Sequence, residues 1–360
     1  MMKILFLIPY PLGESPSQRF RFEQYLESLK NAGYTCRVST FLPASSWRIF
    51  YQPGHLPAKL SLLLGGFFRR VRVLATASRS DFIFLHREAA PIGPPVFEWI
   101  LTRVLRKKII YDFDDAIWLT DKTNESAPEQ WLRWRSKVGS ICRWSYKISC
   151  GNDYLADYAR QFNPNVIVNP TTIDTENLHN PALYQVTKNP EKVVIGWTGS
   201  HSTLKYLTDF IPVIRELQAR HSNLYFLVIA DRDSAPEVDR YEYIPWNKVT
   251  EAADLLTMDV GIMPLPDDVW TRGKCGFKAL QYMSMEIPCV VSPVGVNSAI
   301  IEHGVNGFLA TTLEEWMLYL EELIHNETLR RQLGQAGRKR VIENYSVISN
   351  TSGFCSLFES

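Results

Sequence analysis

The sequence lacks several features that would direct its interpretation at once. Its six cysteines form no CxxC pair and no Cys/His metal spacing, so we expect free thiols in a reducing cytoplasm. No uninterrupted apolar run reaches the roughly 18 residues of a membrane-spanning helix, and no cleavage site follows the apolar run at 4–9. The net charge of only +1 argues against a general nucleic-acid binder.

The composition is that of a packed globular protein. Hydrophobic residues make up 46% and aromatic residues 12% of the 360 positions, which excludes bulk disorder. A chain of this length exceeds one ordinary hydrophobic core, so we expect two domains.

Short apolar runs alternate with amphipathic stretches along most of the chain. In the first half, 20–33 has helical spacing of Phe22, Tyr25, Leu26 and Leu29, and Gly33 supplies a stop. The predicted strands there are 3–9, 36–42, 81–86, 107–113, 146–150 and 165–170.

The second half repeats this alternation. The residues 204–220 predict a helix that Pro212 kinks or breaks. Further helices are predicted at 251–258, 314–326 and 327–345, and strands at 191–197, 223–231, 259–265 and 287–292. Strands that alternate with helices indicate βαβ units and parallel sheets.

We therefore predict an α/β protein of two Rossmann-like, doubly wound domains. They span 1–170 and 190–345 and are joined by a polar, Pro/Asn-rich linker at 171–189. The tail, 346–360, is expected to pack back on the N-terminal domain. Two such domains facing across a cleft would bind ligands at the carboxyl ends of their strands.

The stretch GKCGFKALQYMSMEIPCVV (273–291) places two lysines where a helix should begin. Lys274 and Lys278 flank Gly276, although cations at a helix N-terminus cost about 0.3–1 kcal/mol each. A diphosphate held by the free N–H groups of this helix start would offset that cost. Gln281 lies on the same helix face as Lys278 and suits hydroxyl recognition. The alternative is a solvated surface helix with ordinary lysines.

A second loop, WTGSHSTLKYL (197–207), has a similar character. Gly199 and Ser200 offer backbone amides, and Lys205 lies in the first turn of the helix that follows. Neither a Walker A motif nor GxGxxG is present. Two strand–loop–helix units of this kind indicate one diphosphate held from two sides. No metal-ligand cluster lies near either loop, so no metal or other cofactor is expected.

These stretches resemble the retaining nucleotide-sugar glycosyltransferases of family 4 (glycosyl transferases group 1, GT-B class). The motifs in the C-terminal block are IGWTGSHSTLKYL, DVGIMPL, GFKALQYMSMEIPCVVSPVG and EHGVNGFLA. The N-terminal block is matched more loosely, through NAGYTCRV and VNPTTIDTENL.

The resemblance implies transfer of a hexose, with retention and without a metal, from a UDP- or GDP-linked sugar to a glycan or lipid-linked acceptor. Polysaccharide biosynthesis at the cell surface is the expected context. Lys205 and Lys278 would stabilise the leaving diphosphate with help from Lys274. The remaining donor contacts would come from Gly199, Ser200, Gly276, Phe277 and Gln281.

The sequence departs from the family at three donor positions. Both acids of the Glu-x7-Glu pattern are missing, with Gly273 and Gln281 in their places, and the usual arginine is Gly199. Either the enzyme is inactive, or the added lysines replace the lost groups, which we favour. The rival functions are a non-catalytic GT-B scaffold subunit, a sugar-nucleotide epimerase of the same fold and a two-lobed ligand-binding protein.

Polar residues near predicted strand ends mark an acceptor side in the N-terminal block. Arg19 and Arg21 would face the cleft and reach a donor phosphate or an anionic acceptor; the alternative is that at least one of them is solvated. His86 is a candidate base or polar contact, with a structural role as the alternative. Asp114 and Asp115, close to Asp112, suit hydrogen bonds to sugar hydroxyls better than a metal.

Two basic, apolar stretches point to peripheral contact with the inner face of a membrane. The residues 59–79 carry four arginines and a lysine, and 131–147 interleave three tryptophans with basic residues. Core helices with basic rims are the alternative. No nucleic-acid partner is expected.

Overall fold

The computed structural model describes residues 2–46, 49, 54–120 and 125–359. The remaining positions of the predicted N-terminal domain and of the tail, among them 1, 121–124 and 360, lie outside the described residues. The chain divides into two compact units, Met1–Thr171 with Thr351–Ser360 and Thr172–Asn350.

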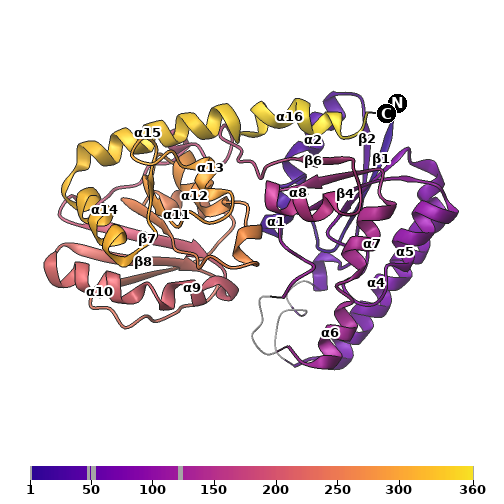
Figure 1. The fold of residues 1–360 in the computed structure, drawn as a ribbon, viewed down its shortest axis with the longest axis horizontal. Helices are drawn as coiled ribbons and strands as arrows, with labels where there is room; N and C mark the ends of the chain where they lie inside the picture. Colours follow the sequence, from indigo (N-terminus) through magenta and orange to yellow (C-terminus); the bar gives the residue numbers. More distant parts are fainter. Residues whose placement is uncertain (1, 47–48, 50–53, 121–124, 360) are drawn as a thin grey trace. The chain divides into compact units, whose positions relative to one another are not determined.

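The first unit is built on a parallel six-stranded sheet (Figure 1). The strands run in the order β2 (Thr35–Thr40), β1 (Lys3–Ile8), β3 (Phe82–His86), β4 (Lys108–Phe113), β5 (Lys147–Cys150) and β6 (Val166–Val168). The central strands β1, β3 and β4 are buried almost throughout, as expected for a parallel sheet covered on both faces. Their register places His86 of β3 directly beside Asp112 of β4.

Helices and short helical turns connect these strands. They are α1 (Pro16–Arg19), η1 (Glu23–Tyr25), α2 (Leu26–Asn31), η2 (Ala44–Ser46), α4 (Leu56–Thr76), η3 (Ala77–Arg79), α5 (Val96–Trp99), η4 (Ile100–Val104), α6 (Ala127–Arg133), α7 (Lys137–Trp144) and α8 (Asp153–Arg160).

The helix predicted at 20–33 is wrong in extent, because the regular α-helix α2 begins only at Leu26. The backbone of Phe22 has φ −139°, outside the helical region. This break lets Arg21 and Phe22, both almost fully buried, turn toward the sheet.

The second unit has another parallel six-stranded sheet. Its strands run in the order β12 (Phe308–Leu309), β11 (Cys289–Val291), β10 (Val260–Met263), β7 (Val193–Gly199), β8 (Leu224–Ala230) and β9 (Tyr241–Pro245). The two edge strands, β9 and β12, were not predicted. The break at Pro212 is confirmed, because α9 (Lys205–Thr208) ends before α10 (Ile211–Arg220) begins.

The remaining helices of this unit are α11 (Glu251–Leu255), α12 (Phe277–Ser284), α13 (Asn297–Ile300), α14 (Leu313–His325) and α15 (Glu327–Asn344). The helix α15 also fastens the irregular segment that precedes the sheet. There, Arg338 donates hydrogen bonds to the carbonyl oxygens of His179 (3.0 Å) and Thr175 (3.2 Å). The helix α16 (Val347–Ser356) ends in the first unit, where Phe354 stacks on Tyr25 at 4.3 Å between ring centroids.

Candidate donor and acceptor sites

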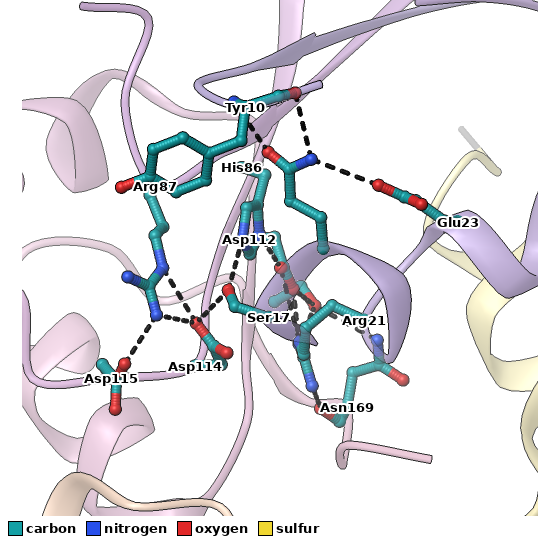
Figure 2. Close-up of polar contacts among 12 residues, drawn as sticks. Tyr10, Ser17, Arg21, Glu23, His86, Arg87, Asp112, Asp114, Asp115 and Asn169 are labelled. Atoms are coloured by element: carbon teal, nitrogen blue, oxygen red, sulfur yellow. Dashed lines mark hydrogen bonds and ion pairs between the residues drawn. The ribbon is translucent and has the colours of Figure 1, made fainter. Parts of the chain in front are cut away.

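A chain of polar side chains lies at the carboxyl ends of the central strands of the first unit. His86 ends β3, and its Nδ1 lies 2.8 Å from Oδ2 of Asp112 on β4. On its other side, Nε2 lies 2.8 Å from Oγ of Ser17 on α1. Figure 2 shows the three side chains in this line. His86 and Asp112 are fully buried, whereas Ser17 is partly exposed.

Buried partners hold Asp112 in its ionised form. Arg21 pairs with the carboxylate, and Ser149 donates a hydrogen bond to its Oδ1 at 2.7 Å. Burial alone would raise the pKa of Asp112, but the charge of Arg21 and the hydrogen bond from His86 lower it below its ordinary value. The other end of Arg21 donates to the carbonyl oxygen of Asn169. Arg21 thus supports Asp112 from beneath the surface.

A second ion-pair group lies beside this line and nearer to solvent. The guanidinium group of Arg87 lies 2.8 Å from Asp114 and 2.5 Å from Asp115 (Figure 2). Burial would raise the pKa of Asp114, but Arg87, with His86 and Arg21 further away, holds it well below its usual range. Arg87 itself has φ +60°, a left-handed conformation that costs energy in residues with a Cβ. The fold therefore maintains an unfavourable backbone to place this guanidinium.

Ser17 joins the two groups. Its hydroxyl donates to Oδ1 of Asp114 at 3.0 Å, so its single hydrogen is used there. The same hydroxyl lies 2.8 Å from Nε2 of His86, whose Nδ1 faces Asp112. Ser17 therefore links the buried His86–Asp112 pair to the group formed by Arg87, Asp114 and Asp115.

The loop that carries Ser17 is fastened by its neighbour, Gln18. The buried amide of Gln18 donates to the carbonyl oxygens of Tyr10 (3.1 Å) and Pro11 (3.3 Å), and it accepts from the Tyr10 N–H (3.0 Å). Its third donor contact is with Glu23, at 3.1 Å. These bonds hold α1 over the sheet edge, so Ser17 has little freedom to move away from His86.

Four of the five residues predicted on the acceptor side belong to this network: Arg21, His86, Asp114 and Asp115. The fifth, Arg19, is largely buried, with its guanidinium 5.0 Å from the ring centroid of Phe20. Ser17 and Arg87 were missed. The signal for Arg87 was its place directly after a predicted strand end, and that for Ser17 was the Ser-Pro-Ser start of a helix.

In the second unit, β7 ends in the first predicted phosphate loop. A Cβ at Gly199 would clash with the ring of Trp197 and with Oγ1 of Thr203, so only glycine fits there. The N–H of Ser200 donates to Oγ1 of Thr203 at 3.2 Å, and the Thr203 hydroxyl returns a bond to the Ser200 carbonyl. The Ser200 amide is thus engaged within its own loop.

An exposed histidine in this loop was also missed. His201 bonds the carboxylate of Asp231 twice, through its main-chain N–H and through Nδ1, each at 2.6 Å. This pair ties the loop after β7 to the loop after β8. It also places an imidazole two residues beyond Gly199. The position of Gly199 itself is the one at which the family would have an arginine.

The second loop contributes the helix start that was predicted. Gly276, with φ +67°, is the residue before α12, and a Cβ there would meet the side chain of Ile300. Phe277 and Lys278, the first residues of α12, are partly exposed. The amide of Gln281 is buried, with Nε2 3.3 Å from Nε2 of His179. Gln281 therefore lies beneath the surface at which hydroxyl recognition was expected.

Buried aromatic groups bring the two loops together. The Nζ of Lys278 lies 5.4 Å from the ring centroid of Trp197, the same ring that underlies Gly199. Tyr282, one turn further along α12, accepts a hydrogen bond from the Thr198 N–H at 3.0 Å. The Tyr282 hydroxyl also donates to the Ile262 carbonyl at 3.2 Å, and burial raises its pKa above the ordinary value.

The other two predicted lysines also lie over aromatic rings. Lys274 is partly exposed, 5.0 Å from the ring centroid of Trp270, and Lys205 is exposed, 5.3 Å from that of Tyr206. Among the described residues, no group of three or more His, Cys, Asp or Glu side chains is arranged to hold a metal ion. The metal-free reaction stays a prediction.

Comparisons with known proteins bear on the fold and on the family of the second unit. Residues 192–326 match the family model for glycosyl transferases group 1. Sucrose-phosphate synthase from Thermosynechococcus elongatus has a similar structure, with a TM-score of 0.72, 13% identity and coverage of 99% of this chain and 98% of that chain. A comparison with curated proteins gave no match.

Two further structures are similar over both chains. HepE from Anabaena, in complex with UDP and glucose, has a TM-score of 0.65 and 16% identity, with 99% of each chain covered. The lipopolysaccharide outer core galactosyltransferase WaaB, in its apo form, has a TM-score of 0.64 and 12% identity, again with 99% of each chain covered.

Residues 192–326 of the second unit thus match the group 1 glycosyl transferases, and the whole chain has the GT-B fold of two Rossmann-like domains. The predicted fold class and the resemblance to group 1 glycosyltransferases are confirmed. Because these solved structures are only 12–16% identical to this chain, their similarity is evidence for the fold alone.

Proposed function

We propose that the protein is a retaining, metal-independent glycosyltransferase. It would move a hexose from a nucleotide diphosphate sugar to a glycan or lipid-linked acceptor, in the cytoplasm, for cell-surface polysaccharide biosynthesis. The observation that carries the proposal is the match of 192–326 to the group 1 model, with Lys278 and Gly199 both next to the Trp197 ring.

The proposed donor site consists of the two loops of the second unit. Lys205 and Lys278 would neutralise the diphosphate as it leaves, with Lys274 assisting, because cations placed where negative charge develops lower the barrier. Gly199, Gly276 and Phe277 would let the backbone approach the phosphates. UDP-glucose is the first donor to test, since HepE is similar in fold and its structures contain UDP and glucose.

The proposed acceptor site is the polar network of the first unit. Its partly exposed members are Ser17, Arg87, Asp114 and Asp115. Ionised carboxylates accept hydrogen bonds from sugar hydroxyls, and the low pKa of Asp114 keeps it in that state. His86 and Asp112 would act behind them by fixing the position of Ser17. No protein nucleophile is assigned.

Thermal shift with UDP, GDP and their glucose and mannose conjugates tests the donor site. We expect one base to stabilise the wild type, and Lys278→Ala to lose most of that shift. Lys339→Ala is the matched control, because Lys339 is an exposed lysine on α15 paired with Glu343. If no nucleotide stabilises the wild type, the proposal fails. An undiminished shift in Lys278→Ala would remove Lys278 from the site.

The replacement of both family glutamates by Gly273 and Gln281 favours one rival, a non-catalytic scaffold subunit. A second rival, an epimerase, would convert the nucleotide sugar in the absence of any acceptor. Proton NMR of the donor, incubated with the protein alone and then with an acceptor, separates the three functions. Conversion without acceptor supports the epimerase, and donor binding without conversion in either mixture supports the scaffold.

A further inference from the structure

The long helix α4 exposes a row of large apolar side chains. Leu56, Leu60, Leu64, Phe68 and Val71 recur at helical spacing, and between 55% and 77% of each is exposed. We call these five residues the α4 ridge. Single exposed leucines are ordinary, but a contiguous row along one helix marks a surface that another apolar phase covers.

The opposite side of α4 is firmly packed, so the ridge has no place in the core of its own unit. Gly66 lies against the Phe41 ring, which leaves no room for a Cβ. The buried guanidinium of Arg70 donates to the carbonyl oxygens of Ala89 (2.6 Å) and Ile8 (2.7 Å). These contacts determine the rotation of the helix, and the ridge faces away from them.

The charged residues of α4 and of the positions next to it in the sequence are all basic. Residues 54–80 contain no acid, and Lys59, Arg72 and Arg79 are at least partly exposed. The guanidinium of Arg72 lies 5.3 Å from the ring centroid of Phe68, so cation and ridge are adjacent. An apolar row flanked by basic side chains is typical of helices that lie in the interface of an anionic membrane.

The elements beside α4 also expose large apolar and basic side chains. The helix α5 packs beside α4, with Phe97 6.0 Å from Phe67 between ring centroids (Figure 1). From Val96 to Val104 the only acid, Glu98, is buried and accepts a bond from the Ala89 N–H. The large exposed side chains on this segment and at 131–134 are apolar or basic: Val96, Trp99, Arg103, Val104, Trp131, Leu132, Arg133 and Trp134. The first turn of α6 also carries Glu129, which is partly exposed.

The stretch 131–147, for which membrane contact was expected, divides into two parts. The helix α7 has buried Val138, Ile141 and Cys142 and is a core helix. Residues 131–134, at the end of α6, instead expose large apolar side chains, as α4 does. No helix of the described residues is long and apolar enough to cross a membrane, so contact would be at the surface.

We propose that the α4 ridge docks the first unit on an anionic lipid bilayer. The five side chains would enter the boundary between headgroups and acyl chains, and the flanking Arg72 and Arg79 would meet lipid phosphates. A second copy of the chain suits this face less well, because a symmetric contact would bring basic residues against basic residues. The inference is independent of the proposed activity, since docking needs neither donor nor acceptor.

Flotation with phosphatidylcholine vesicles, with and without phosphatidylglycerol, tests the proposal on the full chain. We expect binding that requires phosphatidylglycerol and weakens with salt. Leu60→Gln/Leu64→Gln/Phe68→Gln should lower it by roughly a hundredfold, because three large apolar side chains no longer leave water. Arg72→Glu/Arg79→Glu should lower it by roughly tenfold or more on anionic vesicles alone.

The matched control is Val305→Gln/Leu318→Gln/Ile342→Gln, which changes three exposed apolar residues of the second unit. It should bind vesicles as the wild type does, and all variants should keep the wild-type melting temperature because the changed residues are exposed. Failure of the wild type to bind, or equal binding by the ridge variant, would overturn the proposal. So would a wild-type dimer that the ridge variant converts to a monomer without any change in vesicle binding.

Discussion

The charged side chains near the strand ends include a buried group in the first unit and are exposed or partly exposed in the second. In the first unit, Arg21 and His86 are buried and both contact the Asp112 carboxylate, so the charge of that carboxylate is compensated within the protein. In the second unit, Lys274 and Lys278 lie at loop surfaces over tryptophan rings. A ring face attracts a cation only weakly compared with a phosphate. The comparison sets a buried, ion-paired network at the proposed acceptor site against partly exposed lysines at the proposed donor site.

The largest expected effect comes from breaking the compensated network. Arg21→Ala leaves the Asp112 carboxylate buried with one cation fewer, and we expect it to lower the free energy of unfolding by about 3–5 kcal/mol. Urea denaturation followed by fluorescence measures this. Arg21→Met/Asp112→Asn removes both charges and should recover part of the loss. A single variant as stable as the wild type would show that the pair does not support the fold.

The corresponding change in the second unit should leave stability intact and impair the reaction. Lys278→Ala removes a surface cation, so unfolding should change little, whereas kcat should fall by roughly 10²–10³ if Lys278 stabilises the departing diphosphate. Initial rates with the donor found by thermal shift provide the measurement, with Lys339→Ala as the control. A fall in stability with unchanged kcat would reverse the contrast between the units.

A smaller effect is expected at the hydroxyl that sets the position of α12. Tyr282→Phe removes a buried group that bonds Thr198 and Ile262, at an expected cost of about 1–3 kcal/mol in unfolding free energy. Because Lys278 lies one turn away on the same helix, nucleotide affinity should fall as well. Calorimetric titration of UDP measures this. Full affinity in a destabilised variant would show that the donor loops do not depend on this anchor.

The smallest effect concerns pH. The pKa values of Asp112 and Asp114 are lowered in the folded protein, so their ionisation stabilises it above the unfolded carboxyl pKa of about 3.9. This stabilisation is lost as the pH falls through the lower folded values. Asp114→Asn should therefore flatten the acid side of a plot of unfolding free energy against pH. A slope equal to that of the wild type would place Asp114 outside the network.

Much of the fold followed from local patterns. The buried strands β1, β3, β4, β7 and β8 are continuous apolar runs, which predict parallel sheets covered on both faces. The edge strands gave weaker signals, since β9 is a partly buried YEYIP and β12 has two residues. The sequence also did not predict the break at Phe22. The apolar residues there have helical spacing, but packing against the sheet decided the backbone conformation.

The chain's own residues determined the α/β class, the break before α10 and the glycine-led start of α12 with its lysines, since these depend on neighbours in sequence. Only tertiary structure decided which polar groups meet. Ser17, His86 and Asp112 come from three segments, joined because parallel strands bring His86 and Asp112 into register and α1 folds over the same edge. Packing likewise turned Gln281 inward and the α4 ridge outward, because the rotation of a helix depends on the surface that it covers.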